Sequence, residues 1–138
     1  MDYRRCQIFS NTLRGAEEYA HVLYEAGAND EAGEVISNWL PGYDLSGMLH
    51  GHIAWHSALI ALWRGDVEAA LGIYANDVAP SVSRGLPINV ISDTSSFLWR
   101  MQAYGHEGSE GLWQDVANYA SSYFQQPGIP FLSISTWR

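Results

Sequence analysis

Two histidines in the middle of the chain have the spacing of a metal-binding pair. His52 and His56 are four residues apart, so on a helix both imidazoles would project from the same side. Such a pair can hold zinc or another transition metal, but it needs a third ligand and an open position for water. The candidate third ligands are His50, His21 and Glu17. No glutamate follows His52, so the metalloprotease signature His-Glu-x-x-His is absent.

The same pair also has a purely structural explanation. Inside a layered helical protein, His52 and His56 would form hydrogen bonds to the backbone or to a neighbouring helix. We favour this interpretation, because histidine pairs without an evident third ligand are usually structural. The sequence therefore requires no cofactor, and a metal site at His21, His52 and His56 is the alternative.

The composition indicates a globular protein and excludes several function classes. The 138 residues, 47% hydrophobic and 16% charged, suit a single domain spanning 1–138. The chain has seven arginines and no lysine, and its formal net charge is -8. Nucleic acid and anionic membranes would be repelled. Without lysine, the chain also lacks the phosphate-binding lysine of nucleotide loops and the Schiff-base lysine of pyridoxal enzymes.

Two further features bear on location and chemistry. Cys6 is the single cysteine, so no disulfide can form within the chain. The first residues lack the apolar run of a secretory signal, and we expect a cytoplasmic location. The uncharged span 45–63 contains three histidines, so we interpret it as a buried helix and not as a membrane span. A Gly-x-Ser-x-Gly nucleophile elbow is also absent.

A near-repeat predicts the architecture that would position these residues. Ala20, Gly27 and Ala32 recur as Ala58, Gly65 and Ala70, a shift of 38 residues. Repeats of this length are typical of stacked helical hairpins. Small residues suit the close approach of two helices, and glycine suits the left-handed turn between them.

Capping and periodicity predict three hairpins, at about 13–42, 48–79 and 89–126, with a tail at 127–138. Thr12, Asp66 and Ser109 are the expected N-caps, and Gly105 is the third turn glycine. The expected helices run over 13–26, from 29 or 30 to 40, over 48–64, 67–78 and 89–104, and from Ser109 through Tyr123. In the third long helix, Asp93 and Arg100 are seven residues apart, so we expect ionic contacts to another helix.

Three ordered motifs carry a resemblance to a known family. They are His-Gly-His-Ile-Ala-Trp-His-Ser-Ala-Leu at 50–59, the Gly-Asp turn and Ala-Ala-Leu run within 65–74, and Asp-Thr-Ser-Ser-Phe-Leu-Trp-Arg-Met at 93–101. Together they resemble the tetratricopeptide repeat protein 38 family. The resemblance implies an internal slice of an α/α superhelix, and it implies no established catalytic activity. The family's His-x-x-x-His pair in the earlier helix is reduced here to His21, with Glu17 at the first position.

If the first helix of each hairpin lines a concave face, as in tetratricopeptide arrays, a binding groove follows. Aromatic residues, histidine and arginine are typical of a peptide-binding groove. The alternative is that Trp55, Leu59 and Trp99 are core residues between hairpins. The groove residues we expect are Arg14, Glu17, His21, Tyr24, His52, Trp55, Leu59, Ser95, Trp99 and Gln102.

The resulting hypothesis is an all-α, tetratricopeptide-like domain that acts as a non-catalytic scaffold for a protein or peptide. The second hypothesis is a metal-dependent enzyme domain that uses His52, His56 and a third ligand such as His21. A third possibility is a homodimer in which exposed end helices pair. Neither nucleic acid nor a membrane is an expected partner.

Overall fold

The computed structural model describes the backbone of residues 13–107 and 109–124 and the side chains of residues 18–107 and 109–124. Within these ranges the chain is helical and contains no strand, which confirms the all-α prediction. The predicted cap at Thr12 and the tail at 127–138 lie outside the described residues.

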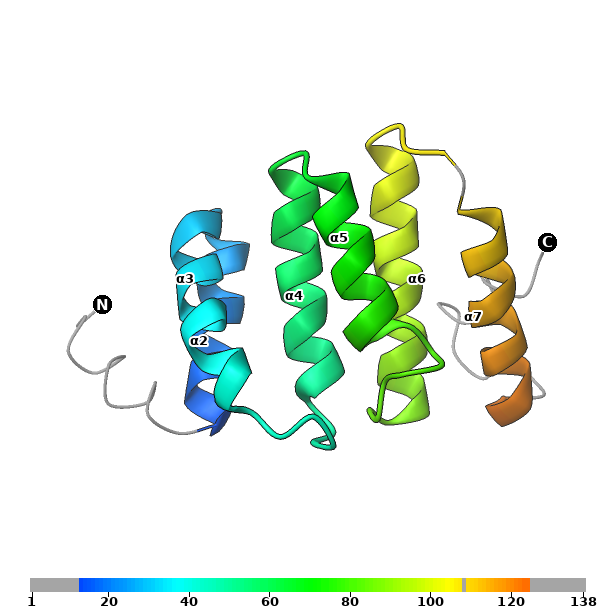
Figure 1. The fold of residues 1–138 in the computed structure, drawn as a ribbon, viewed down its shortest axis with the longest axis horizontal. Coiled ribbons are helices and arrows are strands. Elements are labelled where there is room, and N and C mark those ends of the chain that lie inside the picture. The colour runs from blue at the N-terminus through cyan, green and yellow to red at the C-terminus, as the bar shows by residue number, and fades with distance from the viewer. Residues whose placement is uncertain (1–12, 108, 125–138) are drawn as a thin grey trace.

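The helices follow one another as three pairs (Figure 1). The first pair is α2 (Leu13–Glu25) and α3 (Asn29–Trp39), followed by a short 3₁₀ turn at Leu40–Gly42. The second is α4 (His50–Trp63) and α5 (Val67–Ile73), which continues as a π-helical turn at Tyr74–Val78. The third is α6 (Pro87–Ala103) and α7 (Glu110–Tyr123).

Each pair is closed by a glycine in the left-handed conformation, as the near-repeat predicts. Gly27, Gly65 and Gly105 have φ values of 77°, 79° and 83°. Side chains other than glycine adopt this conformation at a cost. The residue after each glycine donates its N–H to a carbonyl five positions back, which satisfies the end of the preceding helix. These bonds are Ala28 to Leu23 at 2.9 Å, Asp66 to Ala61 at 2.9 Å and His106 to Met101 at 3.0 Å.

The small residues beside the turns lie in the interior, as expected. Ala20 is 2% exposed, and Ala32, Ala58 and Ala70 are 0% exposed. Asp66 also caps α5 as predicted, because its carboxylate accepts a hydrogen bond from the Ala69 N–H at 3.0 Å. Glycine therefore closes all three pairs, the buried alanines line the first two, and a side-chain cap is seen in the second pair.

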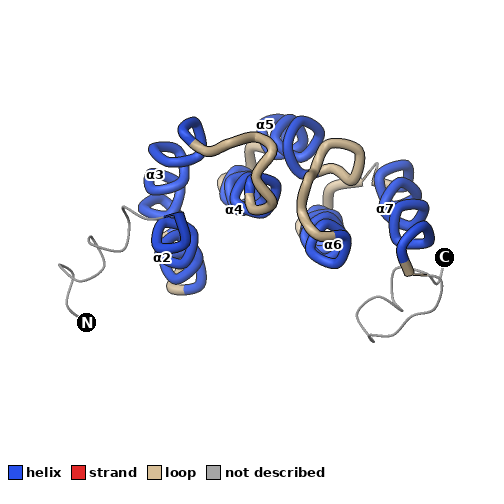
Figure 2. The backbone as a smooth tube through the Cα atoms, turned by 90° about the horizontal axis from the view of Figure 1, so that it is seen from below, coloured by secondary structure: helices blue, strands red, loops and turns tan. Residues whose placement is uncertain are grey.

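Seen end on, the helices form an arched row of two layers (Figure 2). The first helices of the pairs, α2, α4 and α6, lie along the inner side of the arch, and α3, α5 and α7 lie along its outer side. The central helix α4 is the most enclosed, with ten of its 14 residues buried. The span 45–63 is therefore largely an interior helix, and none of the described helices is both long and apolar enough to cross a bilayer.

Three details differ from the sequence predictions. The helix after Asp66 changes to a π turn at Tyr74 and stops before Pro80, since proline cannot donate the next backbone bond. Helix α6 begins two residues early, at Pro87, because proline is favoured in the first helical turn. Ser109 precedes α7, but its side chain makes no capping bond. The Ser109 hydroxyl instead accepts a hydrogen bond from Gln102 at 3.3 Å.

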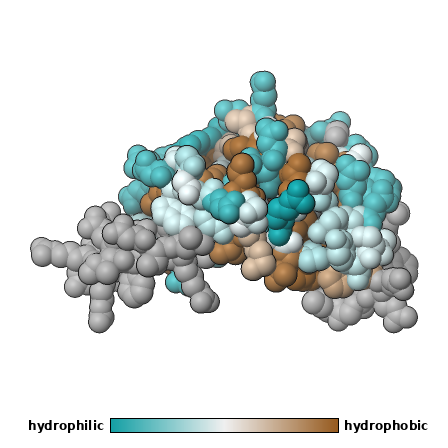
Figure 3. All heavy atoms as spheres, turned by 60° about the horizontal axis from the view of Figure 1, so that its bottom comes forward, coloured by the Kyte–Doolittle hydropathy of each residue, from teal (hydrophilic) through white to brown (hydrophobic). Residues whose placement is uncertain are grey.

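The lower ends of the helices carry the two long connections, at 43–49 and 79–86 (Figure 1). Leu45, Met48, Val82 and Leu86 are exposed there. Figure 3 brings this end forward and shows hydrophobic residues reaching the surface between hydrophilic ones. The 79–86 connection lies against α4, where a Cβ on Gly51 would come within 2.5 Å of the Ser83 hydroxyl.

A pair of alanine-to-leucine changes tests the hairpin register. Ala70→Leu introduces a large side chain where the native residue is 0% exposed, and overpacking of this kind costs about 1–3 kcal/mol. The matched control is Ala69→Leu, because Ala69 is exposed on the same helix. Urea unfolding should show a lower free energy of unfolding for Ala70→Leu alone. Equal values for the two variants would contradict the observed register.

Two glycine-to-alanine substitutions should change the stability of the protein in opposite directions. Gly65→Ala forces a left-handed alanine, at a cost of about 1–2 kcal/mol. Gly72→Ala, within α5, meets no atom within 4 Å, and alanine in a helix is favoured over glycine by about 0.5–1 kcal/mol. Thermal unfolding should therefore give a lower melting temperature for Gly65→Ala, and a higher one for Gly72→Ala, than for the parent chain.

Candidate functional site

Three histidines from two of the first helices, α2 and α4, converge on one another. His21 comes from α2, and His52 and His56 come from α4. Each of the three offers one ring nitrogen, and these three atoms lie within 4.8 Å of one another. The Nδ1 of His21 is 3.2 Å from the Nε2 of His56. We call these three residues the histidine cluster.

The rings of the histidine cluster meet edge to face. The His21 and His52 rings each lie 5.0 Å from the His56 ring, at interplanar angles of 87° and 79°. His52 and His56 are one helical turn apart, so the i,i+4 prediction that they share a side is confirmed. Of the candidate third ligands, His21 joins them. His50 does not, because it stacks on Tyr43 and its Nδ1 is 4.0 Å from Asp77.

A carboxylate from α6 orients His52. The Nδ1 of His52 and the Oδ2 of Asp93 are 3.0 Å apart. A carboxylate can only accept, so the Nδ1 of His52 must carry the proton. In the neutral ring the lone pair then resides on Nε2. The expectation that Asp93 contacts another helix is therefore met, with a histidine as its partner.

A second carboxylate stands near His21. The Nε2 of His21 is 3.9 Å from the Oε1 of Glu25, one turn further along α2. This separation is too long for a hydrogen bond. Two of the three histidines thus have a carboxylate near one ring nitrogen, Asp93 for His52 and Glu25 for His21.

His56 is the buried member of the cluster. It is 2% exposed, and burial, reinforced by the positive charges of His52, His21 and Arg100, lowers its pKa to about 3. His56 is therefore a neutral imidazole at physiological pH. Its Nδ1 is buried without a hydrogen-bond partner among the described residues.

Aromatic rings and one cation surround the cluster. Trp55 lies 5.3 Å from the His52 ring and 4.6 Å from the His56 ring, and Arg100 sits 5.9 Å above the Trp55 ring. Arg100 also donates to the backbone carbonyl of Ser96, at 3.2 Å, and to its hydroxyl. Partial burial raises the pKa of the Tyr24 hydroxyl, which the nearby Arg100 partly opposes.

The remaining expected groove residues divide between surface and core. Trp99 is 63% exposed, whereas Trp55 is 9% and Leu59 is 2% exposed within the main core. For Trp55 and Leu59 the structure therefore favours the alternative of a core position between hairpins. Ser95 is buried and Gln102 is exposed. The side chains of Arg14 and Glu17 lie outside the described residues.

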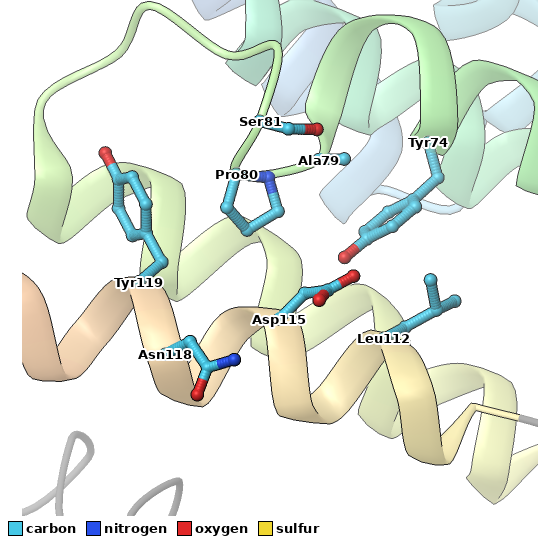
Figure 4. Close-up of a pocket in the computed structure, with 8 residues that line it drawn as sticks. All are labelled: Tyr74, Ala79, Pro80, Ser81, Leu112, Asp115, Asn118 and Tyr119. Atoms are coloured by element: carbon cyan, nitrogen blue, oxygen red, sulfur yellow. The ribbon is translucent and has the colours of Figure 1, made fainter.

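A separate pocket opens on the outer side, between the end of α5, the following connection and α7 (Figure 4). Its volume is 330 Å³. Tyr74 points its hydroxyl toward Asp115, and that hydroxyl is buried without a hydrogen-bond partner among the described residues. Burial, with the negative charge of Asp115, raises the pKa of Tyr74, so its hydroxyl stays protonated. Of the sequence motifs, the run within 65–74 contributes Tyr74 to this pocket.

These observations define an all-helical domain of paired helices with a histidine cluster between α2 and α4. Comparison with known proteins adds no family to this description, because no family model and no solved structure matches the chain. The resemblance to the tetratricopeptide repeat protein 38 family therefore stays a prediction from sequence motifs.

Sequence reasoning missed two contributors to the site. The His52–Asp93 contact joins residues 41 positions apart, and Arg100 reaches Trp55 from a different helix pair. Both residues stood out only as charges on an otherwise uncharged helix. The remaining signal was that a charge packed between helices needs a partner.

The hydrogen bond to Asp93 predicts a specific tautomer for His52. Long-range ¹H–¹⁵N spectra of the imidazoles should show His52 protonated at Nδ1 in the parent chain. The Asp93→Ala variant removes the acceptor, so the Nδ1–H form of His52 should lose its preference. His106, which lies in the turn before α7, serves as the internal control. An unchanged His52 spectrum would show that Asp93 does not set the tautomer.

Proposed function

We propose that this chain is a tetratricopeptide-like helical-repeat domain, an α/α superhelix of three hairpins, that binds a protein or peptide segment along α2, α4 and α6. In this proposal the domain is a scaffold and carries out no catalysis. The observation that supports it best is the row of first helices along the inner side of the arch (Figure 2). A concave row of this kind is how helical repeats bind extended partners.

The residues along these helices support a binding role. Trp99 is 63% exposed, while His21, Tyr24 and His52 are half-buried on the two preceding first helices. Tryptophan, tyrosine and arginine carry much of the binding energy at protein interfaces. Because the chain has a net charge of -8, a basic or neutral segment is the partner that its charge favours.

Two further parts of the hypothesis are proposals of the same kind. A cytoplasmic location is supported by the single cysteine, Cys6. Self-association would instead pair the exposed end helices of two copies of the chain. Light scattering across micromolar dilution separates these cases, because a homodimer dissociates on dilution and a monomer keeps its mass.

Peptide display provides the test of the groove. Twelve-residue peptides selected on the parent chain should bind Trp99→Ala more weakly by roughly 10–30-fold, as expected for loss of an aromatic hot spot. The matched control is Tyr123→Ala, because Tyr123 is an aromatic residue on the outer helix α7 with a similar exposure of 56%. Calorimetry measures both affinities. Peptides that lose equal affinity with both variants, or no enrichment at all, would contradict the proposed groove.

A further inference from the structure

The geometry points to a transition-metal site: we propose that His21, His52 and His56 together bind one divalent ion of the zinc class. Asp93 and Glu25 would orient the ligands from the second coordination sphere. This proposal goes beyond peptide binding and does not depend on it.

The spacing of the ring nitrogens supports the proposal. Two nitrogens at 2.0–2.1 Å from a tetrahedral zinc ion lie about 3.3 Å from each other. The His21 Nδ1 and His56 Nε2 atoms are 3.2 Å apart. All three ligand atoms lie within 4.8 Å of one another. The side chains of His21 and His52 are 45% and 24% exposed, so an ion can reach both rings from solvent.

The second observation is the pair of acidic partners. A metal-bound histidine usually donates its other ring N–H to a carboxylate, which fixes the ring and raises its basicity. Asp93 accepts from the Nδ1 of His52, and Glu25 lies near the Nε2 of His21. Both carboxylates therefore stand near the nitrogens that metal binding would leave protonated.

A structural hydrogen bond between two histidines explains less of the arrangement. It accounts for the contact between His21 and His56, but not for a third imidazole beside them or for its carboxylate partner.

The ligand chemistry selects the class of ion. Imidazole nitrogens suit zinc, copper, nickel and cobalt, whereas magnesium and calcium prefer oxygen ligands. Three protein ligands leave a fourth tetrahedral position open. Because His21 and His52 are partly exposed, water or a group from a bound partner can reach that position from solvent.

The test uses the full chain, purified without a metal-affinity step and freed of metal with a chelator. Titration with Co²⁺ alone should give the visible spectrum of a four-coordinate ion at one ion per chain, and Zn²⁺ should displace it. Zinc affinity should fall for His21→Gln and for His52→Gln by more than the roughly 10–100-fold expected for Asp93→Asn, which removes only an outer partner.

His106→Gln is the matched control, since His106 lies outside the histidine cluster; it should bind zinc as the parent chain does. Because a variant can fail to fold, a second measurement uses the parent chain alone. Added Zn²⁺ should shift the imidazole ¹⁵N resonances of His21, His52 and His56 and leave those of His50 and His106 in place. No bound ion, or equal affinity in the cluster variants and His106→Gln, would overturn the proposal.

Discussion

The burial of α4 constrains the rest of the structure. This helix packs against α3 on one side and against α5 and α6 on the other, and ten of its 14 residues are buried. A polar side chain on such a helix cannot rely on water, so it needs a partner from a neighbouring helix. His52 meets Asp93 of α6, and His56 meets His21 of α2. The site therefore arises where the central helix carries polar groups.

Local sequence signals were sufficient for most of the fold. The turns at Gly27, Gly65 and Gly105 depend on one backbone conformation that glycine adopts readily. The cap at Asp66 depends on a carboxylate three residues before an N–H. The π turn after α5 and the role of Ser109 were not predictable, because both depend on packing against other helices.

The site was predictable only in part, and for the same physical reason. The i,i+4 rule put His52 and His56 on one side of a helix, because that spacing is a property of the helix itself. The sequence offered His21, His50 and Glu17 as third ligands without a means of choosing. The choice follows from how the hairpins stack, which brings α2 to α4 at the level of His56 and directs His50 toward Asp77.

The position of the histidine cluster links the two proposals. His21 belongs to the first hairpin and His56 to the second, so an ion held between them would join two units that are also held by apolar packing around Ile53 and Ile60 and by the ion pair between Arg64 and Asp30. Metal–ligand bonds are directional, whereas apolar contacts tolerate sliding. Metal occupancy would therefore fix the angle between the first and second hairpins. Since that angle sets the curvature of the inner side, an ion at this position would also determine the shape of any segment bound there under the proposed function.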